Sequence, residues 1–279
     1  MAGQDPEITL LVEALAPILP EATHRAPLFQ LRGLEDCLFD LPGLGRALIS
    51  RGNRVVLDPL VTLPEVLSSF WDVVLPLLSL QRGWVPFRAS AVVGPAGAVL
   101  IVGHSGSGKS VAAAQLLSGG FSCAGDGVVP VDLSGSVPML RPTSGTLRLW
   151  PAMADLFTGQ AETHSDHSGR VCMPTALPQT APIPVRGIVR LRVRAGGIEM
   201  GSQDETGVDA LALVQEAVAA QAVARLTGQL SKIFAANATM VQTVPCVTLV
   251  RDTVIGSLPA WQALLERSVR HLLGQEGQP

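Results

Sequence analysis

The sequence predicts an α/β fold, and two observations lead to this prediction. Short apolar or alternating runs, typical of strands, are interleaved along the chain with longer segments of helical periodicity. With 279 residues and 47% hydrophobic content, the chain can also bury one extended core or two smaller ones. We therefore predict a small N-terminal α+β subdomain, or cap, over residues 1–82 and a larger domain over residues 83–279.

Three segments define the predicted N-terminal subdomain. Residues 7–19 have apolar positions at helical spacing and predict an amphipathic helix that breaks near Pro17. The run "RVVLD" at 54–58 is rich in β-branched residues and predicts a short strand. Residues 64–81 predict a largely buried helix.

The larger domain begins with two predicted strands in 87–102, joined by a turn at "GPAG". Residues 109–118 predict a helix that ends at Gly119 and Gly120. A short strand, "FSCA", then leads through "GDG" to a second β-like run, "VVPVDL". The later elements are a helix near Pro151, a long polar loop over 159–182, strands at 183–193 and 196–202, an Ala-rich helix at 208–227, a strand at 245–252 and a helix at 258–273.

Composition argues against several classes of protein. The net charge of −3 provides no basic surface for nucleic acid, so we expect no nucleic-acid partner. The four cysteines lie far apart without a CxxC pair, which argues against a zinc site or a disulfide framework and favours reduced thiols. The best candidate for a membrane span, residues 70–80, is too short and contains Asp72 and Pro76. Since the N-terminus also lacks the basic region of a signal peptide, we expect a cytoplasmic protein with no membrane partner.

The most specific motif is "GHSGSGKS", Gly103 to Ser110, which satisfies GxxxxGK[ST] between an apolar strand and a helix. In such a loop successive backbone N–H groups surround phosphates, and the helix N-terminus adds its dipole. Lys109 is expected at the β- and γ-phosphates, and the Ser110 hydroxyl at Mg²⁺. Lys109 is one of only two lysines among the 20 basic residues of the chain. The predicted nucleotide-binding residues are Gly103, His104, Ser105, Gly106, Ser107, Gly108, Lys109, Ser110 and Val111, with ATP and Mg²⁺ as cofactors.

Asp126 follows Lys109 by seventeen residues, which leaves room for one short helix and one short strand. A ten-residue helix runs about 15 Å away from the loop, and a four-residue strand returns about 13 Å. Asp126 is therefore expected near the phosphate loop, where it would hold Mg²⁺, accept a proton from an attacking hydroxyl, or both. The alternative is an ordinary turn aspartate within "GDG".

From "FRASAVVGPAGAVLIVGHSGSGKS" to "CAGDGVVPVD", the sequence resembles the C-terminal catalytic domain of HPr kinase/phosphorylase, and more closely the stand-alone HPr-kinase-like proteins. "LRLWPAMADLF" and "PCVTLVRD" extend the resemblance over roughly residues 84–270. The resemblance implies a mixed sheet with a phosphate-binding loop, of the type shared with phosphoenolpyruvate carboxykinases. It also implies Mg²⁺- and ATP-dependent phosphorylation of a hydroxyl, usually a serine of a peptide or small protein, and a possible homo-oligomer.

Two departures from the family pattern affect the expected chemistry. The first acid of the family's acidic pair falls on Gly125, and its histidine falls on Arg88. The predicted catalytic residues are then Asp126, Lys109 and Arg88, with Ser110 and Asp126 at the metal. Arg88 is expected either to supply charge to the γ-phosphate or to be an exposed strand residue. A divergent kinase, a nucleotide-binding regulatory or scaffold protein without transfer activity, and a small-molecule kinase remain open.

Weaker patterns involve charged residues outside the phosphate loop. Arg190, Arg192 and Arg194 alternate along one strand and are expected to share a face, either solvated or docking an acidic peptide. "THSDHSGR" contains His164, Asp166 and His167, for which an exposed polar loop is favoured over a metal site. Arg170 could close over the nucleotide, and Arg141 and Arg148 could reach phosphate.

Overall fold

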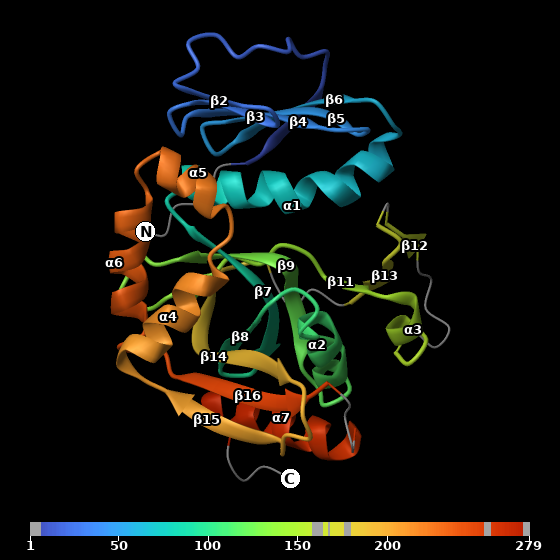
Figure 1. Ribbon diagram of the computed structural model, residues 1–279, viewed down its shortest axis with the longest axis vertical. Coiled ribbons are helices and arrows are strands. Elements are labelled where there is room, and N and C mark those ends of the chain that lie inside the picture. Colours follow the sequence, from blue (N-terminus) through green and yellow to red (C-terminus); the bar gives the residue numbers. More distant parts are fainter. Residues whose placement is uncertain (1–6, 158–163, 167, 176–179, 254–257, 276–279) are drawn as a thin grey trace. The chain divides into compact units, whose positions relative to one another are not determined.

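The computed structural model describes residues 7–157, 164–166, 168–175, 180–253 and 258–275 (Figure 1). The chain divides into two compact units: Met1–Pro86 with Ala220–Ser231, and Phe87–Ala219 with Lys232–Pro279. The division in the first part of the chain falls four residues after the one that we predict. The segment Ala220–Ser231 groups with the first unit, which the sequence does not indicate.

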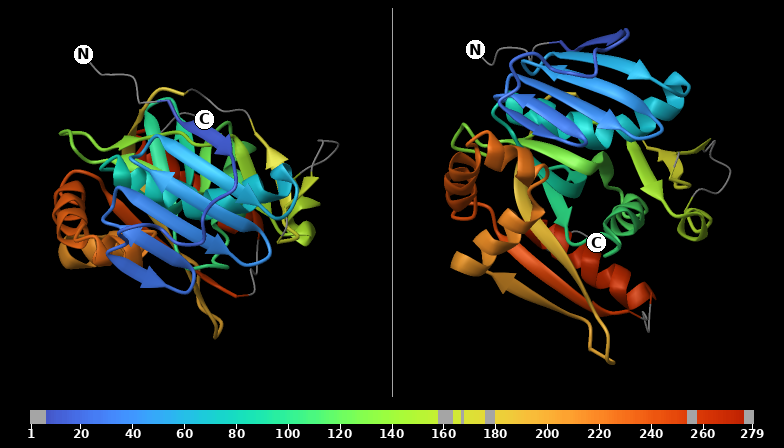
Figure 2. Two further views of the ribbon diagram at one scale, coloured as in Figure 1. Left: turned by 90° about the horizontal axis from the view of Figure 1, so that it is seen from above. Right: turned by 45° about the horizontal axis from the view of Figure 1, so that its top comes forward.

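The first unit contains a six-stranded sheet in the order β1-β6-β5-β4-β3-β2. Strands β2 to β6 form an antiparallel meander, and β1 is parallel to β6 at the edge (Figure 2). Helix α1 packs against β5 and β6. The bounds are β1 (Thr9–Val12), β2 (His24–Ala26), β3 (Phe29–Arg32), β4 (Asp36–Leu41), β5 (Gly45–Ser50), β6 (Arg54–Pro59), α1 (Leu63–Gln81) and, later in the chain, α5 (Gln221–Leu226).

The prediction of a helix over residues 7–19 is wrong. The segment begins with strand β1, whose ends are tied to β6 by the bonds from Thr9 N to Asn53 O (2.8 Å) and from Glu13 N to Leu57 O (2.9 Å). The open edge of β6 satisfies these backbone groups, so tertiary pairing overrides a weak helical pattern. The predicted helix over 64–81 and the predicted strand over 54–58 are confirmed as α1 and β6.

The second unit is built on a seven-stranded mixed sheet in the order β10-β9-β7-β8-β14-β16-β15. Strands β8, β14 and β16 are parallel, whereas β7 forms an antiparallel hairpin with β8 and β15 is antiparallel to β16. A second, three-stranded antiparallel sheet has the order β11-β13-β12. The strands are β7 (Val85–Gly94), β8 (Gly97–Val102), β9 (Ser122–Asp132), β10 (Met139–Leu140), β11 (Thr146–Leu149), β12 (His164–Ser165), β13 (Val171–Pro174), β14 (Ile183–Arg194), β15 (Gly201–Glu205) and β16 (Cys246–Asp252).

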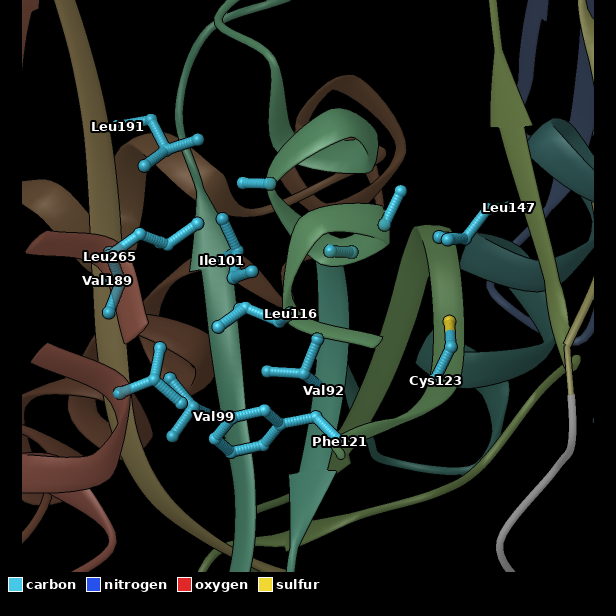
Figure 3. Close-up of a cluster of buried hydrophobic side chains, with 14 of the residues drawn as sticks. Val92, Val99, Ile101, Leu116, Phe121, Cys123, Leu147, Val189, Leu191 and Leu265 are labelled. Carbon is cyan, nitrogen blue, oxygen red and sulfur yellow. The ribbon is translucent and has the colours of Figure 1, made fainter. Parts of the chain in front are cut away.

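Helices α2 and α7 contact each other and cover one face of this sheet, where the main core lies. Figure 3 shows Ile101 of β8, Leu116 of α2 and Leu265 of α7 in this buried cluster, with Phe121 and Val189 beside them. These side chains are close to fully buried, and together they pack α2 against β8. The helices of the unit are α2 (Lys109–Leu117), α3 (Pro151–Ala154), α4 (Gly207–Ala217), α6 (Leu230–Met240) and α7 (Leu258–Leu272).

Most elements predicted for the larger domain are confirmed, with four corrections. "FSCA", "GDG" and "VVPVDL" form the single strand β9, so Asp126 is a mid-strand residue and not a turn residue. The Ala-rich helix is broken into α4 and α5 because Val218 is extended and bridges Phe87, and Ala220 has a left-handed backbone (φ 53°). The described parts of the predicted long loop form β12 and β13, and α6 was not predicted. No helix within the described residues is long and apolar enough to cross a membrane.

Candidate active site

The glycine loop, Gly103–Gly108, connects the buried strand β8 to helix α2. Gly103, Gly106 and Gly108 have φ angles of 145°, 80° and 95°, a region that favours glycine. A Cβ on Gly103 would lie 2.7 Å from Leu191 O and 2.8 Å from Ser107 Oγ. The first glycine of the motif is therefore required both by its backbone conformation and by the approach of β14.

Helix α2 begins at Lys109, directly after the left-handed Gly108. Within the described part of the chain, no side chain caps this helix terminus, and no acidic residue lies in its first turn. The terminal N–H groups are thus available to an anion, and the helix dipole favours one there. The structure provides the strand, loop and helix on which the predicted phosphate site depends.

The Lys109 ammonium folds back over the glycine loop. Its Nζ atom donates to Gly103 O and His104 O, both at 3.0 Å. Burial lowers the pKa of Lys109, the nearby Asp126 carboxylate opposes this change, and Arg88 lowers the pKa further. The ammonium is therefore partly desolvated and held next to an acidic group and a second cation.

Asp126, in the middle of β9, is surrounded by hydrogen-bond donors. Ser90 Oγ donates to its Oδ1 at 2.5 Å, and Ser110 Oγ lies 2.9 Å from both carboxylate oxygens. The backbone N–H of Arg148 donates to Oδ2 at 3.0 Å. The structure thus brings Asp126 to the first turn of α2, as the sequence predicts, and places it against the hydroxyl of the motif serine.

Gly125, where the sequence resemblance places the first acid of the family pair, has little free space. A Cβ on Gly125 would lie 2.7 Å from Thr143 Oγ1 and 3.3 Å from Val129 Cγ2. Thr143 is held in place because its backbone N–H donates to Ala124 O at 3.0 Å. Thr143 therefore occupies the space into which a side chain at position 125 would extend.

The other predicted site residues around the loop differ in how far their side chains are exposed to solvent. Arg88 is exposed on β7, near enough to Lys109 to lower its pKa. His104 is exposed, and its Nε2 lies 3.6 Å from Glu216 Oε1. Ser105 is exposed, whereas Val111 packs against the core cluster.

Two residues near the loop were missed by sequence reasoning. Ser90 is fully buried and reaches Asp126 from β7. Arg251 lies near the end of β16 and reaches toward Ser107 of the loop, with 3.4 Å between its Nη2 and Ser107 O. A signal for Arg251 does exist, because it lies at the carboxyl end of a strand that begins with four buried residues, and the carboxyl ends of parallel strands meet at one edge of a sheet.

Two of the arginines outside the phosphate loop that the sequence singles out form ion pairs within the protein. The expectation that three guanidiniums share one exposed face is wrong for Arg190, which forms an ion pair with the buried Glu205 at 2.6 Å. Arg141 forms an ion pair with Asp132 at 2.7 Å.

Between β12 and β13, Asp166 accepts hydrogen bonds from Ser168 and from the backbone N–H of Arg170. His167 lies outside the described residues, and the described histidines, cysteines and acids form no cluster that could hold a metal ion. All four cysteines are buried free thiols, as their spacing predicts.

Comparisons with known proteins show little similarity at the level of sequence. No family model matches the chain, and no curated protein matches it. Among solved structures, the HPr(Ser) kinase/phosphatase from Coxiella burnetii matches with 12% identity over 68% of this chain and 98% of that chain, with a TM-score of 0.34. A similarity of this size carries no functional inference, so the family resemblance drawn from the sequence stays a prediction.

Proposed function

We propose that this protein binds Mg·ATP at the glycine loop and transfers the γ-phosphoryl group to a hydroxyl, a serine of a peptide or small protein. The observation that carries the proposal is the contact between Ser110 Oγ and both carboxylate oxygens of Asp126, at 2.9 Å each. This contact lies at the uncapped N-terminus of α2, beside a lysine. A hydroxyl and a carboxylate are the hard oxygen donors that Mg²⁺ prefers.

The residues around the loop also fit a polyphosphate. Ser107 Oγ is buried and makes no hydrogen bond within the described chain. Within the described residues, the Lys109 ammonium donates its hydrogen bonds to two loop carbonyls, and a phosphate can replace these at small cost. When bound, Mg²⁺ would supply charge neutralisation to the phosphates, with Ser110 and Asp126 holding it.

In the proposed reaction, an acceptor oxygen forms a bond to the γ-phosphorus while the bond to the β–γ bridging oxygen breaks and ADP leaves. The proton of the acceptor hydroxyl passes to Asp126 or to solvent. Asp126 already accepts bonds from Ser90, Ser110 and the Arg148 N–H, so a proton would take the lone-pair position that these three donors leave, of about four on a carboxylate. Lys109 and the exposed Arg88 place positive charge beside the phosphates, and positioning and charge are the main requirements of phosphoryl transfer.

One observation favours a second function, nucleotide binding without efficient transfer. Thr143 fills the space beside Gly125, so a second carboxylate is absent from this side of Asp126. Loss of a general base lowers a rate by roughly 100- to 10,000-fold. A regulatory or scaffold protein that responds to ATP would keep the loop and tolerate this loss.

The experiment that tests the proposal incubates the protein with γ-labelled ATP, Mg²⁺ and extract from its own source, and measures ATP affinity in parallel. Lys109→Ala is expected to lose ATP binding, and Asp126→Asn to lose labelled product. Lys232→Ala, at the exposed second lysine of the chain, is the matched control and is expected to behave as wild type.

Each outcome separates the alternatives. A labelled species that disappears in both site variants supports the kinase. ATP binding without any labelled species supports the regulatory protein. Absence of ATP binding in the wild type, or equal binding by Lys109→Ala, contradicts both functions.

A further inference from the structure

Arg251 reaches the glycine loop from a strand 144 residues further along the chain. It is the penultimate residue of β16, which is parallel to β14 and, through β14, to β8. Its Nη1 donates to Asp252 O at 3.0 Å, and its Nη2 lies 3.4 Å from Ser107 O. A Cβ on Gly108 would lie 3.4 Å from the same Nη2, so the guanidinium lies directly against the last peptide of the loop.

No acid among the described residues balances the charge of Arg251. Within the described residues Arg251 forms no ion pair, and burial lowers the pKa of its guanidinium. The guanidinium lies 5.7 Å from the ring centroid of Trp261, which is buried, and this contact fixes its direction. Partly buried charges are normally paired, so an unpaired cation beside an uncapped helix terminus indicates that an anion completes the site.

The contact to Ser107 O also determines the direction of the next amide. The peptide unit is planar and trans, so its C=O and N–H point in opposite directions. When Arg251 holds the Ser107 carbonyl, the N–H of Gly108 points away from Arg251. The Ser107 hydroxyl, buried and without a partner in the described chain, gives independent support for a ligand at this segment.

We propose that Arg251 is a positioning residue for a nucleoside di- or triphosphate. It holds the Ser107–Gly108 peptide with its N–H directed at the phosphates, and its charge offsets part of theirs. This inference rests on the proposed function, because it assumes that the glycine loop binds a nucleotide. It extends that function by identifying a residue, on a strand distant in the sequence, that orients a peptide of the loop.

The test measures the Kd of Mg·ATP and Mg·ADP for Arg251→Gln and Arg251→Lys by titration with fluorescent nucleotide analogues. Arg251→Gln removes both the charge and the hold on the Ser107 carbonyl, so it is expected to weaken the binding of both nucleotides about 10- to 100-fold. Arg251→Lys keeps the charge but cannot reach both carbonyls, so an intermediate loss is expected. Adenosine, which lacks phosphate, is expected to bind all three proteins equally.

The matched control is Arg270→Gln. Arg270 belongs to α7 and contacts the chain just after the C-terminal end of α2. Arg270 also lies over a ring, 5.3 Å from the centroid of Phe121, and donates to a backbone carbonyl, Gly119 O, at 3.0 Å. It is not near the glycine loop, so its loss is expected to lower the thermal unfolding temperature without changing nucleotide affinity.

Two results would overturn the inference while the proposed function stands. One is an Arg251→Gln affinity within about threefold of wild type, and the other is an equal loss in Arg270→Gln. If wild type itself binds neither nucleotide, the proposed function fails and the inference fails with it. If Arg251→Gln does not fold, the nucleotide affinity of Arg251→Lys, which keeps a cation over Trp261, is compared with that of wild type and of Arg270→Gln instead.

Discussion

The space beside Gly125 leads to a quantitative prediction about a side chain at this position. In Gly125→Ala, the new Cβ would lie 2.7 Å from Thr143 Oγ1 and 3.3 Å from Val129 Cγ2, whereas ordinary contacts are about 3.5–4.0 Å. Thr143 is β-branched, so it has few alternative rotamers. Its backbone is also tied to Ala124 O. Overpacking of this kind costs about 1–3 kcal/mol.

We expect Gly125→Ala to lower the thermal unfolding temperature by several degrees, since 1 kcal/mol corresponds to about 2–4 °C for a unit of 150–250 residues. Circular dichroism during heating measures this change. Gly135→Ala is the matched control, because a Cβ there meets only Val137 O at 3.8 Å. Its unfolding temperature is expected to stay near that of wild type.

A double-mutant cycle tests whether contact with Thr143 causes the loss of stability in Gly125→Ala. Thr143→Ala removes the atom that the new Cβ would meet, so the double variant Gly125→Ala/Thr143→Ala is expected to recover about 1 kcal/mol or more relative to the sum of the single variants. The reasoning is refuted if Gly125→Ala is as stable as Gly135→Ala, or if the double variant shows no recovery. If the recovery is found, Gly125→Asp in the Thr143→Ala background becomes the variant in which to ask whether a second acid raises phosphoryl transfer.

Three further predictions concern the loop, its acid and the thiols. Gly103→Ala is expected to abolish nucleotide binding, because its Cβ would lie 2.7 Å from a β14 carbonyl at a φ of 145°, and an affinity near wild type in nucleotide titration would contradict this. Ser90→Ala removes a buried donor from the Asp126 carboxylate and is expected to cost about 1.5–3 kcal/mol in urea unfolding, so a change below about 0.5 kcal/mol would show that the bond contributes little. Burial raises the pKa of Cys123 to about 11 and that of Cys246 to about 12, so neither thiol is expected to react with a thiol-specific disulfide reagent at about pH 8 until the protein is unfolded. Folding favours the neutral form of both thiols, so their contribution to the free energy of unfolding is full below the ordinary thiol pKa of about 8.5. This contribution is lost as the pH rises through 11 and then 12. Urea unfolding measured across this pH range checks the expectation.

Local patterns in the sequence were sufficient for the elements that carry the candidate site. The hairpin of β7 and β8, the glycine loop and helix α2 are confirmed because their signals are contiguous: an apolar run, a glycine-rich turn, then good helix formers. Lys109 and Ser110 follow from the same eight-residue motif. The approach of Asp126 also followed from chain geometry, because one helix and one strand return the chain to its starting point.

Only the tertiary structure determined which distant residues complete the site. Ser90 and Asp126 are 36 residues apart, and Arg251 and Ser107 are 144 apart, so their contacts depend on the order of strands in the sheet. The same limit explains the wrong prediction for residues 7–19, where the open edge of β6 decided between strand and helix. Amino-acid patterns specify local periodicity and turns, whereas strand order depends on packing energies summed over the whole domain, which no short segment contains.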